Sequence, residues 1–364
     1  MRQISVGRIA RLAAWLGVAG FGGGYAVVGQ IRDRIVDRWC VMSDDEFGEA
    51  VAIAQSLPGA SGANLFTYLG FRSGGWRGAL LATSLFLLPS ALLMVVFGMA
   101  YDHVSNLQEV STALAWMGPP VVAIVVSVAA RLGRALRRPW QVVAAIAAMS
   151  AVELGIGVFE VVLLAIVASL AVEARRRTLA RPPALSLALP LLMLLPKLAF
   201  VFARLGAVSF GGGMAMVPIL DHQVVGTLGW LTPREFTDAV TLGQITPGPI
   251  AITATFVGYR VAGLAGCCVA TAGTFVPPFL LTVAVARSLD TFRQSPWVAA
   301  VLRALGPVVV GIVAAAAISM GRASIHNVAE GAVALGCLLL LVIEAPTLLV
   351  VVVGASAAGM IALW

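Results

Sequence analysis

Charged residues are scarce in this chain: they make up 11% of its 364 residues, against 60% hydrophobic residues. A soluble domain of this length carries about a quarter of charged residues, so the composition excludes an ordinary soluble protein and predicts a polytopic, all-α membrane protein. The net charge is +7, but the basic residues cluster between apolar runs, as in the loops of membrane proteins. We therefore expect a surrounding lipid bilayer and no nucleic-acid partner.

Residues that hold metals or perform catalysis are also few. The chain has four cysteines and three histidines. The cysteines form no CxxC pair, so we expect no metal site and no cofactor. No Walker A sequence is present, which excludes ATP hydrolysis by this chain as an energy source. The N-terminus lacks the small-residue cleavage site of a signal peptide, and we expect it to remain as the start of the first membrane helix.

The sequence contains an internal duplication. Two motifs recur 189 residues later: Phe21–Gly24 (FGGG) as Phe210–Gly213, and Pro58-Gly59 as Pro247-Gly248. Further along each half the offset becomes 188 residues and stays there. A register with a single slip over most of each half indicates two homologous repeats. We expect an N-terminal transporter repeat over residues 1–174, a cytoplasmic linker over 175–184 and a C-terminal repeat over 185–364.

Each repeat has the same order of apolar segments, which predicts about ten to twelve membrane elements in total. Each repeat closes with a long apolar run, Trp140–Val172 or Val328–Trp364. One helix of that length would measure about 50 Å, more than a hydrocarbon core of roughly 30 Å. We therefore expect two short spans in each run, turning near residues 153–157 and 344–346.

Basic loops predict the orientation of the chain. Arginines precede the first span and cluster again at residues 131–138 and 175–181, whereas residues 101–112 contain no Lys or Arg. By the positive-inside rule, the N-terminus and these clusters are expected in the cytoplasm of a bacterium, with the chain in its inner membrane. The stretch 184–202 is apolar enough to add one crossing, which favours inverted repeats, although a parallel arrangement remains open.

Two apolar segments, Ala54–Arg72 and Leu242–Arg260, are interrupted by a Pro-Gly pair. Proline removes a backbone donor and interrupts a continuous helix. Non-helical backbone at membrane depth is tolerated only where it is buried in protein or lines a cavity. The helix that follows begins with unpaired N–H groups and the positive end of its dipole, which favour an anion. The two segments therefore predict broken or re-entrant helices around an anion site.

The candidate ligands are groups that could donate hydrogen bonds to such an anion. Glycines let backbone amides approach closely, although close helix packing explains a triple glycine as well. Hydroxyl groups can instead bond back to the carbonyl four residues earlier. The arginine in this set could hold the anion's charge or extend to the membrane interface. The candidate substrate-binding residues are Gly22, Gly23, Gly24, Gln55, Pro58, Gly59, Asn64, Arg204, Gly211, Gly212, Gly213, Gln244, Thr246, Pro247, Gly248, Pro249 and Thr253.

Four further charged residues at matching positions are candidates for coupling or gating: Glu46, Glu235, Arg72 and Arg260. Charges near apolar segments mark functional sites in membrane proteins. The two glutamates also have a structural interpretation, because Thr232 and Glu235 have the spacing of a capping box. The two arginines could equally be ordinary loop charges.

The paired FGGG and Gln-x-x-Pro-Gly segments resemble the chromate ion transporter family in its long two-domain form. Ser209–Pro218 (SFGGGMAMVP) and Gly243–Tyr259 are similar to the family's pattern. The resemblance implies export of chromate across the bacterial inner membrane, with sulfate as a related or competing oxyanion. The first repeat departs from the pattern, with Gly29 in place of Pro218 and Ala60 in place of Pro249. The N-terminal site is therefore expected to bind less strongly or to serve as scaffold.

Other functions remain to be weighed against transport by alternating access. A channel or a carrier for another small anion stays open, as does a homodimer. An assembly subunit without transport is disfavoured because inert scaffolds rarely place unpaired backbone in lipid. An intramembrane serine protease would need a base near Ser61, but the three histidines fall in predicted loops. We therefore predict a transporter and not an enzyme.

Overall fold

The computed structural model describes residues 5–20, 23–104, 118–134, 136–156, 158–176, 194–209, 213–288, 295–343 and 349–356 except 351 and 355. Within these ranges the regular structure is helical. The first half comprises α1 (Val6–Ala19), α2 (Gly23–Arg32), the π-helical η1 (Asp33–Arg38), α3 (Asp44–Ser56), α4 (Ser61–Val104), α6 (Gly118–Gly133), α7 (Pro139–Glu153) and α8 (Val158–Arg176).

The second half repeats this order. It comprises α9 (Leu194–Val208), α10 (Gly213–Asp221), the π-helical η2 (His222–Thr227), α11 (Pro233–Ile245), the 3₁₀-helical η3 (Ile250–Ile252), α12 (Thr253–Arg287), α14 (Pro296–Ser324) and α15 (Val328–Val342).

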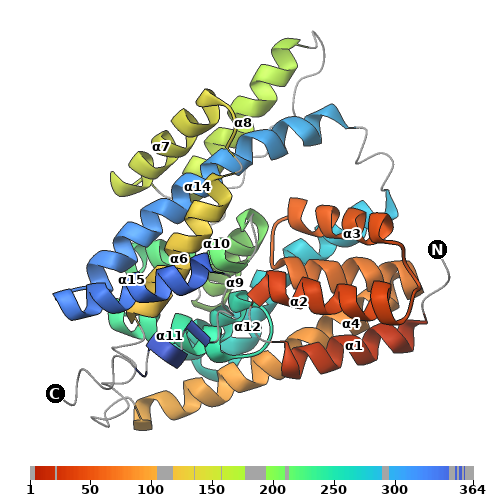
Figure 1. Cartoon of the computed structure of the whole chain (residues 1–364), viewed down its shortest axis with the longest axis horizontal. Helices are drawn as coiled ribbons and strands as arrows, with labels where there is room; N and C mark the ends of the chain where they lie inside the picture. Colours follow the sequence, from red (N-terminus) through yellow and green to blue (C-terminus); the bar gives the residue numbers. More distant parts are fainter. Residues whose placement is uncertain are drawn as a thin grey trace.

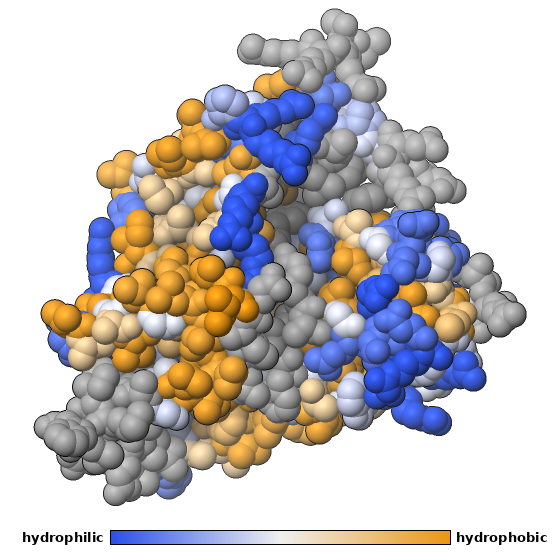
Figure 2. Space-filling view, in the orientation of Figure 1, coloured by the Kyte–Doolittle hydropathy of each residue, from blue (hydrophilic) through white to orange (hydrophobic). Residues whose placement is uncertain are grey.

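The surface of the helices fits a lipid environment. Three helical stretches of the described chain are long and apolar enough to cross a membrane, Ser61–His103, Ile250–Arg287 and Arg303–Arg322. Large apolar side chains such as Leu88, Leu92 and Val96 are more than half exposed, and hydrophobic residues cover much of the face seen in Figure 2. Such a continuous exposed apolar surface is expected of a protein whose solvent is lipid.

The long helices α4 and α12 are helical hairpins. In α4, Gly74 and Gly75 leave the helical conformation, with φ 59° at Gly75. The hydroxyls of Thr67 and Thr83 are 2.7 Å apart, whereas a straight helix would separate them by about 24 Å. The arm 61–73 therefore folds back on the arm 76–104. In α12 the same reversal occurs at Gly263 (φ 59°).

The two repeats are inverted relative to each other. Gly98, near the end of the second arm of α4, packs on Tyr259 beside the turn of α12. Trp76, beside the turn of α4, packs edge-on against Phe279 in the second arm of α12 at 5.2 Å between ring centroids. The second arms of the two hairpins therefore run antiparallel. An axis perpendicular to these arms relates the halves, which is the arrangement of inverted-repeat transporters.

The helices form two groups around this pair of hairpins (Figure 1). Helices α1, α2 and α3 gather at one end, and α7, α8 and α14 lie together along the opposite side. Helix α1 packs on α4, and α9 packs on α12, at glycines that approach the partner helix backbone. Gly17, for example, has the carbonyl oxygen of Phe86 2.7 Å from the position of a Cβ atom.

Several expectations from the sequence can be compared with these helices. The first closing run is split as predicted, because α7 ends at Glu153 and α8 begins at Val158. The second run breaks after Val342, and the predicted turn at 344–346 lies outside the described residues. Helix α8 continues to Arg176, and most of the predicted linker 175–184, like the loop 105–112, also lies outside them.

Candidate functional site

The two Pro-Gly loops lie in the interior of the protein. Pro58, Gly59, Pro247 and Gly248 are all buried. Gly59 has φ 101° and Gly248 has φ 103°, a conformation that residues with a Cβ atom rarely adopt. The loops thus keep two breaks of nearly identical backbone geometry in the middle of the molecule, each immediately before the first arm of a hairpin.

Each loop is attached to the opposite half of the chain. The N–H of Gly59 donates to the carbonyl of Ser209 at 2.7 Å, and the N–H of Gly248 donates to the carbonyl of Gly20 at 3.0 Å. Ser209 and Gly20 occupy equivalent positions, at the end of the first helix of each repeat. Because buried backbone groups must be paired, these reciprocal hydrogen bonds satisfy the broken backbone and join the two repeats.

The predicted glycine-rich sites fall only partly within the described chain. Gly22, Gly211 and Gly212 lie outside the described residues, whereas Gly23 and Gly213 begin α2 and α10. Helices α1 and α9 end at Ala19 and Val208, so the first apolar segment of each repeat is divided into two helices at the glycines. These divisions lie next to the carbonyls that hold the Pro-Gly loops.

Most of the predicted side-chain donors bond to the protein itself. The amide of Asn64 donates to the carbonyls of Ala54 and Pro58 at 3.1 and 2.8 Å. The Thr246 hydroxyl donates to the Leu242 carbonyl, and the Thr253 hydroxyl to the Ile250 carbonyl. These side chains therefore hold the breaks in shape in this conformation, and a direct role in anion binding stays a prediction, as it does for Gln55 and Gln244.

Two buried hydroxyls of the second repeat, beside the first Pro-Gly loop, lack a hydrogen-bond partner among the described residues. Ser209 is 1% exposed and Thr274 is 2% exposed, and neither hydroxyl oxygen is paired. Gly206, one turn before Ser209 on α9, lies against the Thr274 carbonyl of α12. Both hydroxyls therefore come from one helix contact, next to the start of α10. An unpaired buried hydroxyl costs free energy that a bound anion could recover.

The first half has no equivalent pair of hydroxyls. Gly20 stands at the position of Ser209, and Phe86 stands at the position of Thr274. The Phe86 ring packs against Phe66 with 4.9 Å between centroids. This spot is therefore apolar in the first repeat and polar in the second, a difference that repeat comparison could have suggested and that the FGGG and Pro-Gly motifs do not include.

Arg204 contacts an acidic residue of the first half. Its guanidinium lies 3.5 Å from a carboxylate oxygen of Glu160 on α8 and over the ring of Phe200. It also borders a small surface pocket with Ile219 and Gln223. Since Gly211 lies outside the described residues, its predicted partnership with the triple glycine stays a prediction.

The candidate coupling glutamates both form capping boxes. Glu46 accepts from the backbone N–H of Ser43, and Glu235 accepts from the backbone N–H of Thr232. Hydrogen bonding from Ser43 lowers the pKa of Glu46. Burial alone would raise the pKa of Glu235, but hydrogen bonds from Thr232 and Arg260 lower it below its usual value. Both acids therefore cap the start of a helix, and their role in coupling stays a prediction.

Arg260 connects the two halves, whereas its counterpart Arg72 is exposed. The Arg260 guanidinium binds Glu235 at 2.7 Å, and it also binds Asp102 at the end of α4. Its side chain is 20% exposed and lies over the ring of Tyr101, 5.2 Å from the centroid. Arg260 thus belongs to a closed contact between the repeats and not to an open loop.

The sequence analysis missed a buried acid in this contact. Asp238 on α11 is 1% exposed, and its carboxylate accepts a hydrogen bond from the Tyr101 hydroxyl at 2.6 Å. Tyr101 also packs edge-on against Phe256. The only local signal was an acid at the matching position of each repeat, Glu49 and Asp238.

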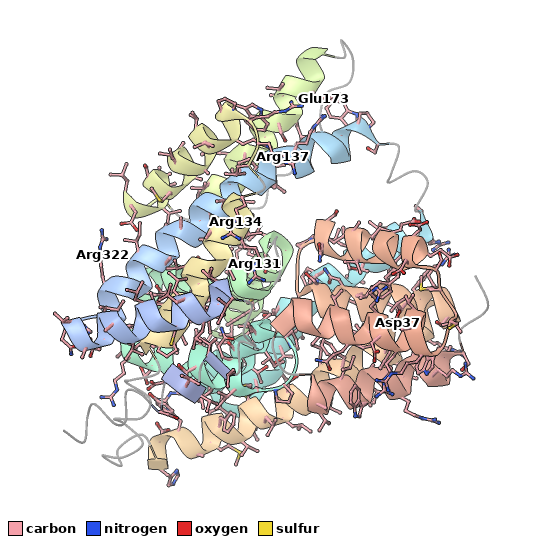
Figure 3. The ribbon with its side chains drawn as sticks, viewed as in Figure 1. Asp37, Arg131, Arg134, Arg137, Glu173 and Arg322 are labelled. Atoms are coloured by element: carbon pink, nitrogen blue, oxygen red, sulfur yellow. The ribbon has the colours of Figure 1, made fainter. Side chains whose placement is uncertain are left out.

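Basic side chains gather around the end of α6. Figure 3 shows Arg131 and Arg134 near each other at the end of α6, with Arg137 further along toward α8. All three side chains are exposed. They belong to the cluster that the sequence assigns to the cytoplasmic side, and that orientation stays a prediction.

Comparison with known proteins identifies the family. The family model described as chromate transporter matches the chain twice, over residues 8–173 and 196–360. A probable chromate transport protein of Synechococcus elongatus is 33% identical over 86% of this chain and 84% of its own length. The chromate transport protein of Cupriavidus metallidurans is 31% identical over 95% of this chain and 90% of its own.

An uncharacterized transporter of Methanocaldococcus jannaschii is 28% identical over 77% of this chain and 75% of its own length. No solved structure matches the chain. The double match agrees with the two repeats seen in the sequence and in the helices. A helical membrane protein with two homologous, broken-helix repeats and relatives named as transporters is a transport protein and not an enzyme, and this chain belongs to the chromate transporter family.

Proposed function

We propose that this chain exports chromate across the bacterial inner membrane by alternating access between its two repeats. The relatives named as chromate transport proteins support the substrate. The observation that carries the mechanism is the reciprocal attachment of each Pro-Gly loop to the other repeat, through Gly59 to Ser209 and Gly248 to Gly20. A site built from both repeats changes its exposure when the repeats move against each other.

The anion binds where the first Pro-Gly loop meets the second repeat, beside the end of α9 and the second arm of α12. Chromate is a tetrahedral dianion, and removing it from water requires several converging donors. Ser209 and Thr274 supply two hydroxyls that are unpaired within the described chain. Ser61 and Gly62 begin α4 directly after this loop, where N–H groups lack intrahelical partners and the helix dipole favours negative charge. Sulfate has the same shape and charge and competes for these donors.

Transport assays with the full-length chain in its membrane test the proposal. Everted membrane vesicles are expected to accumulate labelled chromate, and excess sulfate is expected to reduce the uptake. Imposing the pH gradient and the membrane potential separately identifies the driving force. Flux that rises linearly with chromate concentration, without counterflow, would indicate a channel. Vesicles that accumulate neither oxyanion would overturn the proposed function.

Variants at the two unpaired hydroxyls test the site. Ser209→Ala and Thr274→Val each remove one donor to a charged ligand, worth about 1.5–3 kcal/mol, so the apparent Kd for chromate is expected to rise roughly tenfold or more. Ser73→Ala is the matched control, because its hydroxyl bonds to the Leu69 carbonyl within its own helix. Unchanged chromate binding in both variants would show that the anion does not bind at this position.

A further inference from the structure

Asp238 is a buried carboxylate with one neutral hydrogen-bond donor from the other half of the chain. Its side chain accepts from the Tyr101 hydroxyl at 2.6 Å, across 137 residues of sequence. Asp238 lies on α11, which leads directly into the second Pro-Gly loop. The hydrogen bond can exist only while the end of α4 rests on α11, so it depends on how the two repeats sit against each other.

Among the described residues, no charged side chain contacts this carboxylate directly. On α12, Arg260 binds Glu235 and Asp102, and its guanidinium faces the Tyr101 ring. On α11 itself, the charge of Arg234 lowers the pKa of the Asp238 carboxyl, and the charge of Glu235 raises it. The other described arginine, aspartate and histidine side chains on elements packed against α11 are Arg72, Arg77, Asp102 and His103 on α4, Arg287 on α12, Arg131 on α6, Asp221 on α10, and Arg303 and Arg322 on α14.

The equivalent place in the first repeat is less enclosed. Glu49 stands where the second repeat has Asp238, and Glu49 is only partly buried. Arg72, the counterpart of Arg260, is exposed. Because the repeats are inverted, these two places lie at opposite ends of the contact between the hairpins. In this conformation the chain is closed over Asp238 at one end and more open around Glu49 at the other.

We propose that Asp238 is a proton-binding group of the transport cycle. It takes up a proton from water as the two repeats close on it at the Tyr101 end, and it returns the proton to water when they separate there. Enclosing a charged carboxylate with one neutral donor costs free energy that protonation removes. Proton binding and closure are therefore linked, and the linkage acts in both directions. Asp238 is a positioning residue in this scheme, not a ligand of the anion.

This inference rests on the proposed transport function and deepens it. Chromate is added to the purified full-length chain in a weakly buffered detergent solution. A pH-sensitive dye then measures the protons that are released or taken up. The wild type is expected to exchange protons on binding, to an extent that varies with pH, and Asp238→Asn is expected to lose the exchange. Glu49→Gln, at the matching position, is expected to keep it. Proton exchange that persists in Asp238→Asn would overturn the inference. Chromate binding to the wild type without proton exchange would overturn it as well.

A second variant keeps the acid in place if Asp238→Asn does not fold. Tyr101→Phe removes the hydrogen bond that stabilises the charged carboxylate and preserves the ring. The pH profile of proton exchange is expected to shift to higher pH by about one unit. An unshifted profile contradicts the pairing.

A cross-link reports closure of the same end without any anion, and so separates this inference from the proposed function. Tyr259 Cβ lies 3.0 Å from the Cβ position of Gly98, so Gly98→Cys with Tyr259→Cys is expected to form a disulfide when the end is closed. The rate of disulfide formation is measured in the double-cysteine protein and in the same protein carrying Asp238→Asn. The ratio of the first rate to the second is expected to fall as the pH rises. A ratio independent of pH would reject the proton linkage even if chromate is not the substrate.

Discussion

Gly59 and Gly248 occupy a backbone conformation that other residues can reach only under strain. Both have φ near 100°. A Cβ atom at Gly59 would lie 2.6 Å from the Cβ of Pro278, and one at Gly248 would lie 2.8 Å from the hydroxyl of Ser90. The partner residues belong to the opposite repeat, so the glycines permit the two halves to approach at the breaks.

Gly248→Ala is therefore expected to destabilise the protein and reduce transport. Strained backbone of this kind costs about 1–3 kcal/mol, before the contact with Ser90 is relieved. Thermal unfolding of the purified chain measures the change as a lower Tm. The control is Gly48→Ala in α3, where nothing lies within 4 Å of the added Cβ and alanine is expected to stabilise the helix by about 0.5–1 kcal/mol. Equal Tm values for both variants would contradict the argument.

At the scale of one element, α11 begins with a well-formed cap and ends at the second break. The Thr232 hydroxyl accepts from the backbone N–H of Glu235, and the Glu235 carboxylate accepts from the backbone N–H of Thr232. The same carboxylate binds Arg260 at 2.7 Å. One acid therefore determines where α11 starts and connects it to the first arm of α12.

The cap predicts a dependence of stability on pH. Because hydrogen bonds lower the pKa of Glu235 in the folded protein despite its burial, its contribution is complete above the unfolded pKa, about 4.5, and is lost as the pH falls through the lower folded value. Tm measured from pH 7 to pH 3 is expected to fall less steeply in Glu235→Gln than in the wild type. Parallel curves would show that this acid does not contribute.

On the scale of the whole molecule, the two hairpins determine how the repeats can move. Their second arms are antiparallel, and the end of each arm lies at the turn of the other hairpin, as the contacts of Gly98 with Tyr259 and of Trp76 with Phe279 show. The Pro-Gly loops lie between these ends. Separation at one end with closure at the other would expose the centre to each side in turn.

Locking one end is therefore expected to stop transport. The disulfide between Gly98→Cys and Tyr259→Cys, formed after the natural cysteines are replaced, is expected to abolish chromate accumulation in vesicles, and a reductant is expected to restore it. Each single cysteine variant serves as a control that cannot cross-link. Full transport with the disulfide intact would show that this end does not open during the cycle.

The sequence by itself determined the membrane class, the duplication, the positions of the breaks and the helix caps. Each of these depends on local composition, on spacing within one helical turn, or on a register that can be compared along one dimension. The resemblance in the FGGG and Pro-Gly segments was confirmed by the family match over both repeats. The predicted split between α7 and α8 was confirmed for the same reason, since hydrocarbon thickness limits helix length.

Only the tertiary structure decided how the repeats are related and which groups meet between them. Inversion follows from contacts between the arms of α4 and α12, and the sequence left it open. The Tyr101–Asp238 bond was not predicted, nor were the hydroxyls of Ser209 and Thr274, which have no partner in the described part of the chain. The hydrogen bond joins two residues that are 137 positions apart in the sequence. A hydroxyl without a hydrogen-bond partner can be recognised only when the positions of its neighbours are known. Local pattern carries no information about such contacts, because packing between distant helices creates them.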